Sequence, residues 1–218
     1  MSRVLLSRVL AILSVLSVVV LLVMGSMLKP EYSQVSNYIS ELSATGSAHA
    51  NAFALAGFLP IAILLATFLF VAAPVIRLDG ASRVGYWLLL SQPVAYIAAA
   101  LAPCDPGCPM QGSTSQQIHN LLGLMTYIAG GAGLFLMASC NTLGRAAKAG
   151  LIAGGLAWCL SFALMPEPAL TEWRGLLQRI SEIVFWLVVL FIAFRLTDTE
   201  SMASNRTAPD APSASGSS

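Results

Sequence analysis

Charge is scarce in this chain of 218 residues: only 10% of positions are Asp, Glu, Lys or Arg, against about 25% in ordinary soluble domains. The net charge is +1, so no basic surface exists to hold nucleic acid or to attract an acidic partner over a distance. The sequence also lacks a catalytic serine elbow, a phosphate-binding loop and a metalloprotease helix motif. These absences exclude a soluble domain and a nucleic-acid partner, and they leave no familiar catalytic motif.

Apolar residues are abundant instead: 57% of the chain is hydrophobic and the mean hydropathy is +0.78. About 20 apolar residues in a helix cross a hydrocarbon core of about 30 Å. The runs are continuous and do not alternate as barrel strands do, which favours helices. The sequence therefore predicts an all-α bundle of six transmembrane helices, a multi-pass protein of a bacterial cell membrane, over Val4 to Leu28, Ala52 to Ala73, Val84 to Ala102, Ile118 to Cys140, Ala146 to Met165 and Gly175 to Phe194.

The basic residues predict how the bundle is oriented. The first run is too long for a signal peptide and has no cleavage site, so it is read as a span. One side of the membrane then carries Arg3, Arg8, Arg77, Arg83, Arg145, Lys148, Arg195 and Arg206. The other side carries Lys29, Arg174 and Arg179. Because basic residues are retained in the cytoplasm, both termini are predicted to be cytoplasmic, with the loops 29 to 51, 103 to 117 and 166 to 174 outside.

The end of the chain differs in composition from the rest. Residues 197 to 218 are rich in Ser, Ala and Pro and have no apolar periodicity. Such a segment buries too little surface to offset its ordering entropy. The expected organisation is a membrane domain over residues 1 to 196 and a disordered cytoplasmic tail over 197 to 218.

The longest outer loop has helical periodicity. Its apolar residues Val35, Tyr38, Ile39 and Leu42 recur at helical spacing, and Ser33 and Gly46 are suitable cap and terminator. This pattern predicts a short amphipathic helix lying flat on the outer surface of the bundle or membrane. Such a segment is either a simple connector or a lid over a site.

The stretch "PCDPGC" carries the cysteine chemistry. Cys104 and Cys108 flank Asp-Pro-Gly, a turn that brings two Cα atoms to about the 5.5 Å of a disulfide. An exterior loop is oxidising, so a structural disulfide is the leading interpretation. A zinc site is the alternative, but the spacing departs from the two-residue zinc knuckle and two more ligands are needed.

Polar residues gather where the outer loops meet the spans. His119 and Asn120 stand at the outer start of the fourth span and His49 at that of the second, while Arg179 and Glu182 share a face near the outer end of the sixth. Each has a structural interpretation as an interfacial residue that snorkels or is satisfied locally. The functional hypothesis is that all of them converge on one outward-facing cavity, with Glu41 and Asp105 reaching in from the loops.

A metal centre and a mid-membrane polar site are weaker expectations. A catalytic metal usually needs three protein ligands, and only His49 and His119 are available as histidines, so no metal is expected and the cofactor is unknown. Ser91-Gln92-Pro93 with Tyr96 predicts a kinked polar spot in the third span, which we interpret as a packing device.

Three segments taken in order are similar to those of a known family. "YSQVSNYISELSATG" precedes the second span, "PCDPGC" followed by "HN" leads into the fourth, and "GLLQRISE" enters the sixth. Over about residues 4 to 196 the chain resembles the domain-of-unknown-function 998 family of small bacterial membrane proteins. Ser43 departs from the glycine expected there, which affects only the local turn. The resemblance implies six helices and no particular activity.

Three function classes follow from these residues. The preferred one is a non-enzymatic protein that binds a lipid head group or a partner protein, either another membrane protein or a second copy, through the outer polar site. The alternative is a membrane-embedded hydrolase or transferase acting on lipid head groups, with or without a metal. A transporter is least favoured, because the sequence pattern places no carboxylate or histidine near the centre of a span.

Overall fold

The computed structural model describes residues 1–197, and the predicted disordered tail lies, except for Thr197, outside the described residues. The described chain is all helical and contains six helices long and apolar enough to cross a membrane. They are Arg3–Leu28, Ala50–Val75, Gly80–Leu101, Thr114–Ala138, Arg145–Leu164 and Pro168–Leu196. The six predicted spans are confirmed, including the fifth, which contains Lys148.

Several spans combine more than one helical element. The first, fourth and fifth are the single helices α1 (Arg3–Leu28), α6 (Thr114–Ala138) and α7 (Arg145–Leu164). The second span consists of α2 (Ala50–Ala52), the π-helix η2 (Phe53–Phe58), α3 (Leu59–Ala72) and η3 (Ala73–Val75). The third consists of α4 (Gly80–Leu88) and α5 (Ser91–Leu101). The sixth consists of η4 (Pro168–Trp173), α8 (Arg174–Phe191) and η5 (Ile192–Leu196).

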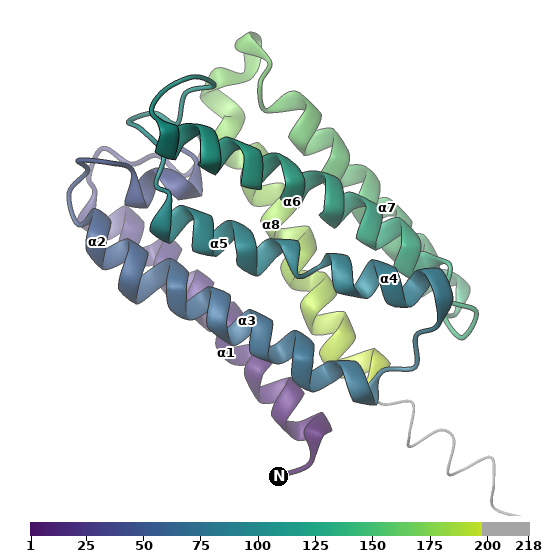
Figure 1. Ribbon diagram of the computed structural model, residues 1–218. Coiled ribbons are helices and arrows are strands. Elements are labelled where there is room, and N and C mark those ends of the chain that lie inside the picture. Colours follow the sequence, from purple (N-terminus) through teal and green to yellow (C-terminus); the bar gives the residue numbers. More distant parts are fainter. Residues whose placement is uncertain (198–218) are drawn as a thin grey trace, which may run out of the picture.

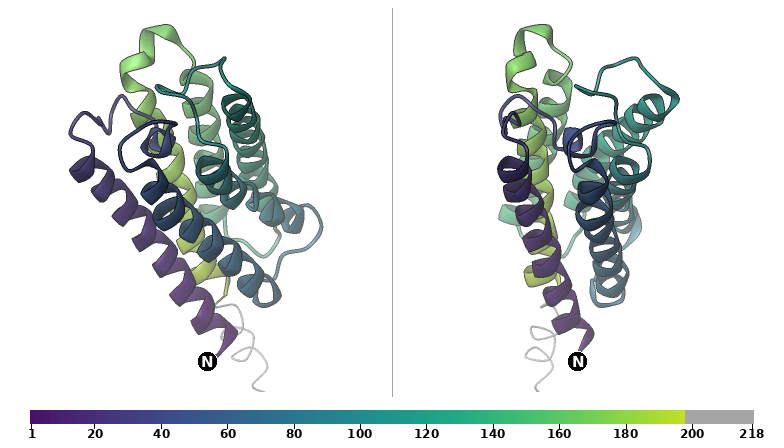
Figure 2. Two further views of the ribbon diagram at one scale, coloured as in Figure 1. Left: turned by 60° about the vertical axis from the view of Figure 1, so that its left-hand side comes forward. Right: turned by 90° about the vertical axis from the view of Figure 1, so that its left-hand side faces the viewer.

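The six spans form a closed ring in chain order (Figures 1 and 2). Each span packs on the next, and α8 returns to pack on α1. Short connections favour this arrangement because neighbours in sequence become antiparallel neighbours in space. Small residues allow the closest approaches: a Cβ on Gly85 of α4 would lie 2.6 Å from the carbonyl oxygen of Gly133 on α6. Side chains that point into the ring can therefore meet from spans distant in sequence.

The third span is broken where the sequence predicts a kink. α4 ends at Leu88 and α5 begins at Ser91, and Pro93 in the first turn of α5 has no N–H to donate. The Gln92 N–H donates a 3.1 Å hydrogen bond to the carbonyl of Leu89, three residues earlier, in a tight turn between α4 and α5. The break sets the polar Gln92 side chain inside the ring, where it is only 3% exposed.

The predicted amphipathic helix in the first long loop is wrong in length and place. The segment forms a short 3-10 helix, η1 (Ile39–Ser43), and all five of its residues are buried. Ser33 caps only a turn, accepting hydrogen bonds from the N–H groups of Val35 and Ser36. Packing against the bundle outweighs the weak helical periodicity, because the segment buries polar and apolar side chains alike. The 32–43 loop is therefore inserted into one end of the ring.

Both ends of the described chain lie at the opposite end of the bundle from the 32–43 loop (Figure 1). The connections 76–79 and 139–144 lie at that same end as the termini, as six antiparallel spans require. All but one of the basic residues assigned to the cytoplasm are found there, and Arg206 lies outside the described residues. The charge asymmetry that predicts the orientation therefore corresponds to the two ends of the bundle.

Candidate functional site

A half-buried carboxylate lies inside the ring of spans. Glu182 on α8 is equidistant in sequence from the two ends of the span Pro168–Leu196. Its Oε1 accepts a 2.7 Å hydrogen bond from Gln92 Nε2, and its Oε2 accepts hydrogen bonds from the Tyr96 hydroxyl at 2.6 Å and Trp186 Nε1 at 3.1 Å. The expectation that no span carries a carboxylate near the bilayer centre stays a prediction: Glu182 lies halfway along the helical segment Pro168–Leu196, which includes η4 as well as α8.

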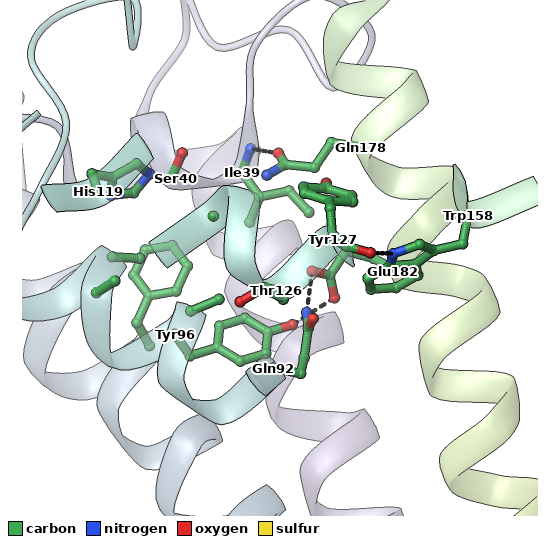
Figure 3. A pocket seen from close by; sticks show the side chains of 15 residues that line it. Ile39, Ser40, Gln92, Tyr96, His119, Thr126, Tyr127, Trp158, Gln178 and Glu182 are labelled. Carbon is green, nitrogen blue, oxygen red and sulfur yellow. Dashed lines mark hydrogen bonds between the residues drawn. The ribbon is translucent and has the colours of Figure 1, made fainter. Parts of the chain in front are cut away.

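Glu182 lines a cavity of about 70 Å³, which we call the inner cavity. Figure 3 shows Glu182 with Gln92 on one side of it and His119 with Ser40 on the other. Its walls are formed by Ile39, Ser40, Phe58, Gln92, Ala95, Tyr96, Ala98, Ala99, His119, Gly123, Thr126, Tyr127, Trp158, Gln178 and Glu182. The structure thus brings His119 and Glu182 to one cavity, as predicted, together with residues from η1 and from five of the six spans.

A larger hollow adjoins the inner cavity. This side groove has a volume of about 340 Å³ and is lined by Tyr38, Ser40, Cys108, Met110, His119, Asn120, Leu121, Gly123, Leu124, Tyr127, Phe162, Met165, Pro166 and Gln178. It shares Ser40, His119, Gly123, Tyr127 and Gln178 with the inner cavity. Leu121 and Leu124 are 56% and 44% exposed, so the groove lies along the apolar outer face of α6. The inner cavity, which contains the Glu182 carboxylate, therefore adjoins an apolar groove on the exposed face of α6.

Arg179 does not pair with Glu182, although the two share a face of α8. Its Nε donates to Gln34 Oε1 at 2.6 Å, its Nη1 donates to the carbonyls of Asn37 and Gly175, and its Nη2 donates to the Tyr32 hydroxyl. Residues i and i+3 share a helical face, but a long side chain can turn toward either end of the helix. The 32–43 loop offers several acceptors, so Arg179 binds the loop rather than the cavity.

Glu41 also fixes the loop rather than lining the cavity. Its carboxylate accepts hydrogen bonds from the Tyr38 N–H and from Asn37 Nδ2, both at 2.9 Å, and forms a 3.3 Å ion pair with Arg174. Gln178, which the sequence interpretation missed, accepts a 2.6 Å hydrogen bond from the Ile39 N–H. Together these contacts tie the loop to the start of α8.

Tyr32 links the loop to Arg179. Its hydroxyl donates to the carbonyl of Tyr38 and accepts from Arg179. Burial raises the pKa of Tyr32 to about 12, so the hydroxyl keeps its proton and both hydrogen bonds across the physiological range.

Asp105 and Asn120 organise the loop before α6. The Asp105 carboxylate accepts 2.8 Å hydrogen bonds from the N–H and the hydroxyl of Ser113, the residue that caps α6. These two donors lower the pKa of Asp105. Asn120 lines the side groove, and its Nδ2 donates to the carbonyls of Pro109 and Met110. Asp105 lines neither cavity and has a structural role.

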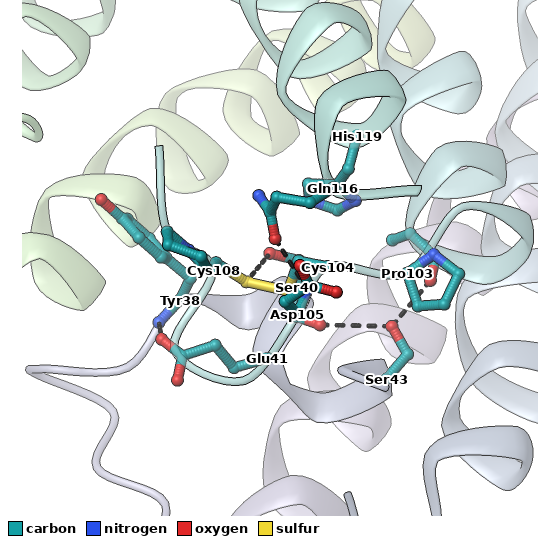
Figure 4. Close-up of a disulfide and its surroundings, with 12 residues drawn as sticks. Tyr38, Ser40, Glu41, Ser43, Pro103, Cys104, Asp105, Cys108, Gln116 and His119 are labelled. Carbon is teal, nitrogen blue, oxygen red and sulfur yellow. Dashed lines mark hydrogen bonds between the residues drawn. A yellow bond between two sulfur atoms is a disulfide. The ribbon is translucent and has the colours of Figure 1, made fainter. Parts of the chain in front are cut away.

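The predicted Cys104–Cys108 disulfide is present, with a Cα–Cα distance of 5.1 Å (Figure 4). Ser40 of η1 lies 3.5 Å from the Cys108 sulfur, and Cys108 lines the side groove. The Nδ1–H of His119 donates to the carbonyl of Ala102 at 3.0 Å, just before the disulfide loop. The disulfide therefore lies at the mouth of the cavities and close to His119.

His49 is not brought to the cavities. It is exposed, adopts a left-handed backbone with φ of 59° and begins α2. Neither cavity includes it among its lining residues. The sequence signal, a histidine at the start of a span, is identical to that of His119, and only the packing of the spans separates the two.

One cluster has the geometry of a metal site. The ligand atoms of Cys104, Cys108 and His119 lie within 4.8 Å of one another, and within residues 1–197 no other such group of three is found. A metal needs the thiolate form of cysteine, and the disulfide removes it. In the oxidised chain the cluster is therefore not a metal site, and His49 and His119 do not share one.

Several lining residues were missed or misinterpreted in the sequence. Gln92 and Tyr96 were assigned to packing, whereas both bind the Glu182 carboxylate. Gln178 lies one turn before Glu182 on the same face of α8, a spacing that could have associated the two. Tyr127 and Trp158 carried no signal, because aromatic residues are common in spans.

Comparison with known proteins places the chain in a family. No curated protein and no solved structure matches the chain. A family profile described as "Protein of unknown function (DUF998)" matches residues 9–195, a range that includes all residues of both cavities and all six spans except the start of the first and the last residue of the sixth. The chain therefore belongs to the DUF998 family of proteins of unknown function.

Proposed function

We propose that this protein binds the head group of a membrane lipid, with the polar part in the inner cavity and the apolar part in the side groove. The observation that supports the proposal is that the two hollows adjoin and share the wall residues Ser40, His119, Gly123, Tyr127 and Gln178. An amphipathic ligand needs polar partners for its head group and an apolar wall for its chain. The inner cavity and the adjoining side groove offer these two environments.

The volumes and surroundings support a ligand from the bilayer. The side groove, about 340 Å³, is within the range of small-molecule sites, about 300–1,000 Å³. Phe162 of α7, Met165 directly after α7 and Leu124 of α6 give it an apolar wall suited to an acyl chain. Because the 32–43 loop lies over the inner cavity, a ligand would enter laterally from the lipid rather than from water.

Gly123 allows a direct test. It lines both cavities, and a Cβ built on it meets no atom within 4 Å, so Gly123→Leu fills the shared space without a backbone clash. Gly150 is the matched control, because it is also a helical glycine with open space and lies in a different groove. Native mass spectrometry of protein purified in mild detergent should show bound lipid in the wild type and Gly150→Leu, and much less in Gly123→Leu. Equal lipid in all three proteins would contradict the proposal.

The same preparation separates binding from catalysis. A binder returns every added lipid unchanged after prolonged incubation, and it contains no stoichiometric metal. Release of a head group or of an acyl chain that Gly123→Leu abolishes would instead establish a lipid hydrolase or transferase, the alternative function.

The proposed orientation places this site in the outer leaflet. A reporter active only outside the cytoplasm, inserted at Gly112 in the exposed loop before α6, should give signal. The same reporter fused at Ala208 should give none. The reverse pattern would transfer the lipid site to the inner leaflet.

A further inference from the structure

The Glu182 carboxylate has hydrogen-bond donors but no counter-ion. It accepts hydrogen bonds from Gln92, Tyr96 and Trp186, all of them neutral. Within residues 1–197 no basic side chain forms an ion pair with it, and Arg179, one turn away, directs its guanidinium to the 32–43 loop. Burying a carboxylate is costly unless it is paired. A cationic ligand would supply the positive ion-pair partner that Glu182 lacks.

Gln92, which lines the same cavity, carries a second acceptor. Gln92 is only 3% exposed and lines the inner cavity, and its Nε2 is used by Glu182. Its Oε1 is buried and has no hydrogen-bond partner in the protein. A carbonyl oxygen can only accept, and a buried acceptor left unpaired is destabilising. The ligand that satisfies Gln92 and Glu182 together must therefore be a hydrogen-bond donor.

Aromatic rings complete the surroundings. Phe58, Tyr96, Tyr127 and Trp158 all line the inner cavity, with ring centroids 6.1 Å apart for Phe58 and Tyr96 and 5.3 Å apart for Tyr127 and Trp158. The faces of aromatic rings attract cations, most strongly where water is excluded, and groups of such rings recognise ammonium ions. Figure 3 shows the Tyr96 and Tyr127 rings on either side of the Glu182 and Gln92 side chains.

We propose that the inner cavity binds an ammonium group, held by the Glu182 carboxylate, the Gln92 carbonyl and the surrounding aromatic rings. This inference rests on the proposed lipid site and names its head-group class. The volume of about 70 Å³ holds several water molecules, each needing about 10–15 Å³, and so accommodates a small amine. Because the inner cavity shares a wall with the apolar side groove, an amine carried by a lipid, such as phosphatidylethanolamine, is the favoured ligand.

The test compares lipids that differ only in the head group. Full-length protein in nanodiscs is titrated with phosphatidylethanolamine or phosphatidylglycerol of identical acyl chains, and bound lipid is counted by native mass spectrometry. The wild type should prefer phosphatidylethanolamine by about ten-fold or more, the effect of a hydrogen bond to a charged group. Glu182→Gln should bind both lipids alike, and Glu172→Gln, which removes an exposed carboxylate just before α8, should keep the preference.

Free amines identify the source of the ammonium group. Ethanolamine that displaces phosphatidylethanolamine, when sodium chloride at equal ionic strength does not, supports the ammonium site. Ethanolamine that binds Gly123→Leu protein as well as the wild type would assign the site to a free amine that does not need the groove.

The failure of this inference is distinct from failure of the lipid site. Equal binding of the two lipids by the wild type overturns the ammonium proposal, and this comparison needs no variant. A preference that Glu182→Gln retains overturns it as well. In either case lipid binding that Gly123→Leu abolishes leaves the proposed function standing.

Discussion

Arg179 and Glu182 are ionisable residues three positions apart on α8, the first buried and the second half-buried, yet they have opposite kinds of partner. Arg179 is 8% exposed and gives its donors to Tyr32, Gln34, Asn37 and Gly175. Glu182 receives donors only from neutral side chains and lines a cavity. The first charge holds a loop, whereas the second has no ion-pair partner within residues 1–197. Their hydrogen-bond partners, more than their positions on the helix, therefore distinguish the two charges.

The largest expected effect tests the structural half of this comparison. Arg179→Met removes the guanidinium and leaves its buried acceptors unpaired, so the free energy of unfolding should fall by about 3 kcal/mol or more. The measurement is a sodium dodecyl sulfate titration in mixed micelles followed by circular dichroism. Arg145→Met, at an exposed position, should change it little. Similar stability of the two variants would show that the 32–43 loop does not depend on Arg179.

A smaller effect is expected at the mouth of the cavities. The Cys104–Cys108 disulfide closes a very short loop, so the double variant with serine at both positions should lose about 2 kcal/mol. Alkylation of denatured, non-reduced wild type should label only Cys140 and Cys159, and reduction should add two further labels. Labelling of all four cysteines without reduction would show that Cys104 and Cys108 are not joined by a disulfide.

The cap of α6 should contribute less and should depend on pH. Ser113→Ala removes the cap and one donor to Asp105, at a cost of about 1 kcal/mol locally. The pKa of Asp105 is lowered in the fold, so its contribution is present above the unfolded value of 3.8 and is lost as the pH falls through the folded value. Ser113→Ala should move this loss to higher pH. Hydrogen exchange at residues 113–117 measures the pH at which this protection is lost. An unchanged pH profile in Ser113→Ala would show that the pKa of Asp105 does not depend on Ser113.

The smallest effect is expected at Glu182. Glu182→Gln keeps an acceptor for Tyr96 and Trp186, and Gln92 can turn its amide to accept from the new Nε2–H. Stability should therefore change by less than about 1 kcal/mol, whereas Glu182→Leu should lose more because three donors become unpaired. A loss with Glu182→Gln as large as that of Arg179→Met would show that the carboxylate charge is structural, and the contrast between the two residues would disappear.

The sequence by itself determined the membrane class, the six spans and the disulfide. These follow from local quantities: the length of apolar runs needed to cross a bilayer, and the turn that joins Cys104 to Cys108. The motifs that resemble the DUF998 family lie in the same segments that the family profile covers. His119 and Glu182 could be selected as candidates because polar residues are few in such a chain.

Only the tertiary structure decided which of these residues meet. His49 and His119 have the same local signal, but the ring of spans leaves one outside and turns the other inward. Periodicity cannot predict that η1 folds into the bundle, nor that Arg179 and Glu182 take different partners. Both depend on hydrogen-bond donors and acceptors supplied by segments 90 and 145 residues away. Sequence patterns report on one helix face at a time, and a cavity at the centre of a ring is formed by faces of several helices at once.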